Sequence, residues 1–157
     1  MANVNDYVTG KILTDTKWAF FLLKFLKIPV LGSRIKSKLL AKVNAFEPKL
    51  INIKKAAILI KNAKKCAAGE RVCRQLYKNT ELTESIFLDE LAEGMVLIAK
   101  AQFVSQEKAI NILQKYQKNP LILSKVTDKY QEICRSWPEK CVYWNMQKYG
   151  LKCLTKG

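Results

Sequence analysis

The sequence contains no histidine. Histidine is the usual general base near neutral pH, and it often shares zinc sites with cysteine. A nucleophile activated by histidine is therefore excluded, and a metal site would have to rely on cysteine thiolates. The chain also shows no glycine-rich phosphate loop and no acid pair in an apolar setting, so an enzyme is the less favoured interpretation.

Glycine and proline are scarce, with six and four residues in a chain of 157. This composition suits helices joined by short turns, and the 49% apolar share is enough for a buried core. We therefore predict an all-α fold, a compact bundle of about six to seven short helices with a short extended segment near 121–126. The prediction is one domain over 1–157: a loose segment 1–14, basic amphipathic helices over 16–65, and a cysteine-bearing helical part over 66–157.

Helix positions follow from apolar spacings of three and four residues and from capping residues. Ser105 is expected to cap the helix that follows it, and Gly150 to follow the last helix. The predicted helices cover about 16–27, 33–46, 48–65, 83–99, 106–117, 127–135 and 138–149, with a short one at 71–77.

Long apolar runs are missing. The longest aromatic-rich run, Trp18 to Leu23, is followed by Lys24 and Lys27 and is too short to span a bilayer. The first 16 residues contain Asp6 and Asp15, unlike a secretory signal. We expect a cytoplasmic protein, or one held peripherally on the inner face of a membrane, with reduced thiols.

Acidic residues are scarce in the first half of the chain. The formal net charge is +15, and residues 1–80 hold 17 Lys and Arg against 4 Asp and Glu. A field of this size indicates an acidic protein partner or an anionic membrane surface, and nucleic acid is an alternative. The side chains expected to contact this partner are Lys24, Lys27, Arg34, Lys36, Lys38, Lys42, Lys54 and Lys55.

Five cysteines are present, and they are predicted to lie at or beside helix ends: Cys66, Cys73, Cys134, Cys141 and Cys153. Thiolates there can accept hydrogen bonds from free backbone N–H groups, and neighbouring Lys and Arg lower thiol pKa values. Four thiolates would satisfy a [4Fe–4S] cluster, which we favour, or a zinc ion. Ordinary buried thiols and a redox disulfide pair are the competing interpretations.

The leading functional hypothesis is a small helical protein that binds a metal through these cysteines, in electron transfer or redox sensing. Its basic helices would dock an acidic partner or a membrane surface. The first alternative is a nucleic-acid-binding module resembling a helix-turn-helix unit, built from 84–99, 106–117 and 121–126, with inert cysteines. The second is a peripheral membrane protein anchored by residues 16–46.

Overall fold

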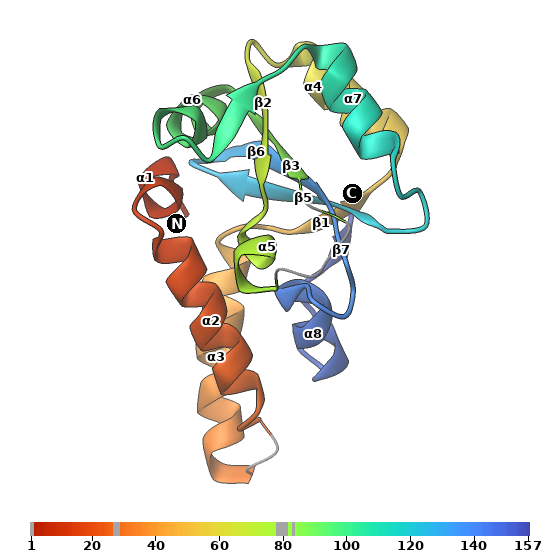
Figure 1. Ribbon diagram of the computed structural model, residues 1–157. Helices are drawn as coiled ribbons and strands as arrows, with labels where there is room; N and C mark the ends of the chain where they lie inside the picture. The colour runs from red at the N-terminus through yellow and green to blue at the C-terminus, as the bar shows by residue number, and fades with distance from the viewer. Residues whose placement is uncertain (1, 27–28, 78–81, 83) are drawn as a thin grey trace.

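The computed structural model describes residues 2–26, 29–77, 82 and 84–157. It is an α/β fold built on one seven-stranded sheet (Figure 1). The helices are α1 (Val4–Val8), α2 (Lys11–Leu23), α3 (Pro29–Asn44), α4 (Ile53–Asn62), α5 (Val72–Leu76), α6 (Asp89–Leu97), α7 (Gln106–Gln114) and α8 (Val142–Lys148). The strands are β1 (Lys49–Ile51), β2 (Cys66–Glu70), β3 (Glu84–Leu88), β4 (Ala101–Phe103), β5 (Leu121–Val126), β6 (Lys129–Arg135) and β7 (Thr155–Lys156).

The strands follow the order β4-β2-β3-β6-β5-β1-β7 across the sheet. Every neighbouring pair is antiparallel except β1 and β7, which run parallel. At the centre of the sheet, Ser85 of β3 lies opposite Cys134 of β6, and Glu132 of β6 lies opposite Ser124 of β5. Side chains alternate between the two faces of a strand, so Glu132 and Cys134 share one face.

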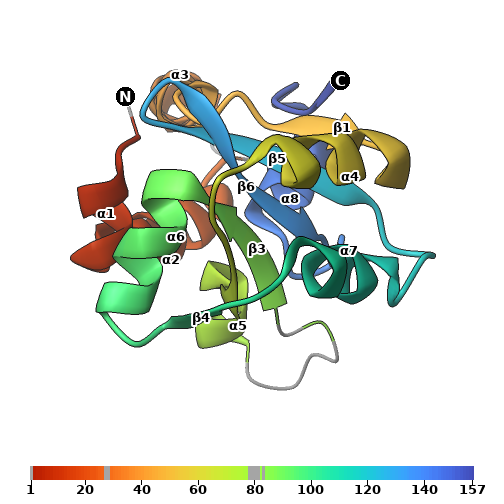
Figure 2. The same cartoon turned by 90° about the horizontal axis from the view of Figure 1, so that it is seen from above.

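Helices cover both faces of the sheet (Figure 2). On one face, α4 and α7 pack through Ile60 and Leu113 against strand residues that include Ile86 and Ile133. On the other face, α1 and α6 pack against Phe87 and its neighbours, and α2, α3 and α8 form a further apolar cluster. Glu132 and Cys134 belong to this second face, beneath the N-terminal helices.

The predicted all-α bundle is wrong, because a seven-stranded sheet organises the molecule. Residues 127–135 were predicted to form a helix and instead supply β6. Helices cover both faces of β6, and neighbouring strands pair with both of its edges. Gln131, Ile133 and Arg135 are therefore all buried, and apolar and polar residues do not simply alternate along the strand. Such a central strand cannot be distinguished from a helix by periodicity.

Other strands were also predicted as parts of helices. Residues 84–88 and 49–51 were placed in the first turns of helices, but they form β3 and β1. Cys66 was predicted to end a helix and begins β2. The segment 1–14, predicted to be loose, contains α1. Asn3 and Asp6 cap the N-terminus of this helix through reciprocal hydrogen bonds between the side chain of each and the backbone N–H of the other.

Two other structural expectations have clear outcomes. Among the residues that the structure describes, no helix has the length and apolarity needed to cross a bilayer. The helix-turn-helix arrangement is not formed, because α6 and α7 pack on opposite faces of the sheet and β4 separates them in the chain.

Candidate functional site

A cavity of about 430 Å³, partly open to solvent, lies between the sheet and the N-terminal helices. The sheet supplies Ser85, Ser124, Glu132 and Cys134 to one wall. The opposite wall comes from α1, α2 and α3, and α5 and α8 close the remaining side. The lining residues from these helices include Tyr7, Ile12, Thr16, Ala19, Leu39, Val43, Cys73, Val142 and Tyr143.

Three cysteines line this cavity: Cys73, Cys134 and Cys141. They come from three separate elements, since Cys73 lies in the first turn of α5, Cys134 on β6, and Cys141 at the residue before α8. Their sulfurs are close enough for a charge on one to raise the pKa of another, which holds for Cys134 with both other thiols. The fold thus gathers thiols that lie 61 and 7 positions apart in the chain.

All three thiols are held in their neutral form. Burial raises the pKa of Cys73, raises that of Cys134 well above its usual range, and raises that of Cys141 to about 12. Cys73 and Cys134 are half-buried, and both belong to the lining of the cavity.

The sheet contributes the Glu132 carboxyl group to the cavity, which Asp6 and Asp15 also line. The Tyr7 hydroxyl donates a hydrogen bond of 2.6 Å to Glu132 Oε2, and the Ser85 hydroxyl donates one of 3.3 Å to Oε1. Burial raises the pKa of Glu132, and these two hydrogen bonds and the Arg71 charge oppose the rise. The two hydrogen bonds thus fix the orientation of the carboxyl group, and burial favours its protonated form.

Arg71 is a buried cation in the lining of the cavity, where Lys11 and Lys42 pair with Asp6 and Asp15. It is 4% exposed, and its Nη1 and Nη2 donate hydrogen bonds to the backbone carbonyls of Arg135 and Leu82 at 2.6 and 2.5 Å. Its Nε has no hydrogen-bond partner among the described residues. The Arg71 charge lowers the pKa values of Cys73, Cys134 and Cys141 against the effect of burial. It is positioned to offset negative charge on the thiols.

The other two cysteines lie elsewhere. Cys66 is on the opposite face of the sheet, in the apolar cluster under α4 and α7, and its thiol lies 3.8 Å from the Ile60 carbonyl oxygen. Cys153 is buried after α8, with its thiol 3.4 Å from the Tyr143 carbonyl oxygen. Burial raises both pKa values, that of Cys153 to about 11. Both side chains belong to apolar clusters of the core, Cys66 with α4 and α7 and Cys153 with α2, α3 and α8.

An iron–sulfur cluster of the [4Fe–4S] type takes four cysteine ligands, and only three cysteines line the cavity. Among the described residues, no group of three or more Cys, Asp or Glu side chains stands arranged to hold a metal ion. The structure therefore lends no support to the iron–sulfur interpretation. Any metal would have to draw the three thiols together by side-chain rotation.

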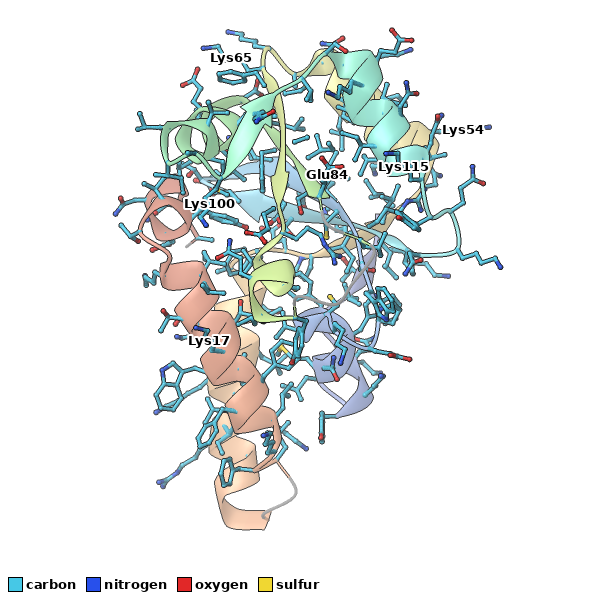
Figure 3. All side chains as sticks on the ribbon, viewed as in Figure 1. Lys17, Lys54, Lys65, Glu84, Lys100 and Lys115 are labelled. Atoms are coloured by element: carbon cyan, nitrogen blue, oxygen red, sulfur yellow. The ribbon has the colours of Figure 1, made fainter. Side chains whose placement is uncertain are left out.

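The basic residues expected to contact one anionic partner do not form one surface. Arg34, Lys36, Lys38 and Lys42 are exposed on α3, and Lys24 is exposed directly after α2. Lys54 and Lys55 are exposed on α4, which lies at the far end of the molecule from α2 and α3 (Figure 3). Lys27 lies outside the described residues.

Sequence reasoning missed Tyr7, Arg71 and Glu132 as cavity residues. Tyr7 was assigned to a loose segment, and Arg71 was considered only as a charge beside Cys66 and Cys73. The spacing of two residues between Glu132 and Cys134 could have indicated that both side chains share one face of a strand. Because residues 127–135 were predicted to be a helix, this spacing was not interpreted in that way.

Comparison with known protein families, with curated proteins and with solved structures finds no match to this chain. The functional argument therefore depends on the chemistry of the cavity.

Proposed function

We propose that the protein binds a thiophilic divalent metal ion, zinc in the first instance, in this cavity through Cys73, Cys134 and Cys141. The observation that carries the proposal is the convergence of these three thiols, from α5, β6 and the start of α8, on one cavity. Zinc takes four ligands in a tetrahedron and accepts mixtures of thiolate and carboxylate. Three sulfurs and one Glu132 oxygen make such a set.

Glu132 is suited to be the fourth ligand. It stands two residues before Cys134 on β6, so both side chains project from the same face of the sheet toward the cavity. The hydrogen bonds from Tyr7 and Ser85 orient its carboxyl group. Partners that orient a ligand in this way are typical of metal sites and strengthen binding.

Charge balance supports the assignment. Three thiolates and one carboxylate carry four negative charges, and a divalent ion leaves two of them uncompensated. Arg71, which is buried and acts on all three thiols, removes one more. Without such a cation, the buried excess charge would strongly disfavour the bound state.

The proposed site needs rearrangement on binding, because no group of thiols and carboxylates among the described residues is already arranged for a metal ion. Each cysteine has a single rotatable bond between its backbone and its sulfur, so rotation of the side chains is the first movement expected. The neutral thiols lose their protons when the ion binds, so binding is coupled to proton release. We infer a role in which the bound metal serves structure, storage or sensing, because the cavity residues described above do not point to a substrate.

The experiment uses cobalt as a spectroscopic substitute for zinc. The reduced full-length protein is titrated with Co²⁺ without oxygen, and the sulfur-to-cobalt charge-transfer bands and the visible bands of tetrahedral cobalt are recorded. Zinc is then added to displace the cobalt. We expect one ion per chain, with both sets of bands lost on zinc addition.

The chain supplies its own matched controls. Cys73→Ser, Cys134→Ser and Cys141→Ser should each weaken binding at least about a hundredfold, since each removes a direct ligand. Cys66→Ser and Cys153→Ser change buried thiols outside the cavity and should leave cobalt binding unchanged. Absence of charge-transfer bands in folded wild-type protein, or equal losses in all five variants, would refute the proposal. A protein purified without oxygen that instead carries iron and sulfide would assign the thiols to a cluster.

A further inference from the structure

The end of α2 carries an exposed aromatic ridge. Trp18 is 55% exposed and Phe21 is 48% exposed, and Phe25 lies partly buried beside them. The Trp18 and Phe21 rings meet edge to face with centroids 5.6 Å apart, and those of Phe21 and Phe25 are 5.0 Å apart. Spacings of three and four residues place the ridge along one side of the chain.

The ridge lies on a part of the molecule that projects from the sheet. Figure 1 shows α2 and α3 side by side and extending well beyond the sheet, so that the two helices form an arm. The opposite side of α2 is occupied, since Ala19 and Leu23 are buried in the cluster that also holds Leu39 and Val43 of α3. The aromatic ridge is therefore not part of the core. Helix α2 has two apolar sides, one packed in the core and one exposed.

The arm carries exposed cations that no described acid pairs with. Lys17 and Lys24 are exposed and lie within one helical turn of Phe21. The neighbouring helix α3 also carries exposed cations: Arg34, Lys36 and Lys38. Among the described residues, the ion pairs of the arm and its base are Lys42 with Asp15 and Lys11 with Asp6, and none involves these five cations.

We propose that this arm docks on an anionic lipid bilayer, with Trp18, Phe21 and Phe25 at the interface and Lys17, Lys24 and the α3 cations against the headgroups. Tryptophan and phenylalanine favour the boundary between headgroups and acyl chains, and lysines gain from the negative surface beside them. A second copy of the chain fits less well, because two arms in contact would bring ten unpaired cations together. The proposal is independent of the metal site.

The test is co-sedimentation of the full-length protein with vesicles of phosphatidylcholine alone or mixed with phosphatidylserine. We expect binding to the mixed vesicles, little binding to the neutral ones, and loss of binding as salt is raised. The double variant Trp18→Ala/Phe21→Ala should lose most of the binding. Its control is Phe103→Ala, which removes an aromatic ring of similar exposure (53%) from β4 on the sheet and should bind like the wild type.

Charge variants test the second half of the proposal. Lys17→Gln and Lys24→Gln should each lower partitioning about fivefold on mixed vesicles, whereas Lys115→Gln, at the end of α7, should change nothing. Circular dichroism verifies that each variant is folded. The proposal is overturned if the aromatic double variant binds like the wild type, if neutral vesicles bind equally well, or if the ridge instead holds a dimer, seen as a halved mass of the double variant in sedimentation equilibrium.

Discussion

The affinity of the cavity for zinc should rise steeply with pH, because zinc must displace protons from three neutral thiols. The perturbation is a change of pH between about 6 and 8, a range in which all three thiols are protonated in the metal-free protein. Each proton displaced raises the apparent association constant about tenfold per pH unit. Three thiols therefore predict a rise of about a thousandfold per unit, and a Glu132 proton adds to this wherever that group is still protonated.

The structure also sets the cost of this displacement. The Cys141 thiol, with its pKa of about 12, needs about 7 kcal/mol to lose its proton at pH 7, at about 1.4 kcal/mol for each pH unit. Apparent binding energies of structural zinc sites are about 10–16 kcal/mol at pH 7. Because Cys134 also has a raised pKa, we expect zinc to bind more weakly here than in those sites at neutral pH.

The assay is competition between the protein and a chelator of known affinity at a series of pH values. Calorimetry in two buffers of different ionisation enthalpy counts the protons released. Cys141→Ala, which removes one of the three thiols, should lower the slope from three to two while the fold is retained. A slope near zero in the wild type, or an unchanged slope in the variant, would refute the assignment of neutral thiols as ligands.

Three further predictions concern the metal-free protein, and urea unfolding measures each. The raised pKa of Glu132 means that folding favours its protonated form, so its contribution to stability is complete at low pH and is lost as pH rises through the pKa of the folded state. The stability of Glu132→Gln relative to the wild type should therefore increase as pH rises from about 4.5. A difference in unfolding free energy that stays constant with pH would contradict the raised pKa. Ile60→Ala should lower the free energy of unfolding by about 2–5 kcal/mol because Ile60 is fully buried. Ile58→Ala on the same helix, at a site 60% exposed, should lower it by less than about 0.5 kcal/mol. Equal losses in the two variants would contradict the burial of Ile60 on the inner side of α4. Gly69→Ala should cost about 1–3 kcal/mol, because the added Cβ would lie 2.5 Å from the Ala101 Cβ and force β2 and β4 apart; unchanged stability would show that this pairing is looser than the structure has it.

Local sequence determined several helices and their ends. Ser105 was predicted to cap the helix that follows, and its side chain accepts a hydrogen bond from the Lys108 backbone N–H. Gly150 was predicted to follow the last helix and has a φ of +79°, a conformation that glycine adopts easily. Such signals act over a few residues, so they survive without knowledge of the rest of the chain.

The absence of histidine also limits the chemistry of any site, whatever the fold. The sequence further determined that the basic residues concentrate in the first 80 positions, but it did not determine where they face. Lys17 and Lys54 belong to the same basic segment, but Figure 3 shows them at opposite ends of the molecule. Position along the chain therefore predicted the charge of the segment and not the shape of a binding surface.

Tertiary structure alone decided the sheet and the cavity. Strand β6 lies at the centre, where long-range pairing with β3 and β5 outweighs the local pattern that indicated a helix. The same pairing decides which thiols meet: Cys134 faces the cavity with Cys73 and Cys141, whereas Cys66, on β2, faces the other side of the sheet. The neighbours of a thiol depend on the order of the strands and on the face of the sheet from which the thiol projects. The residues next to a cysteine in the sequence do not determine either of these.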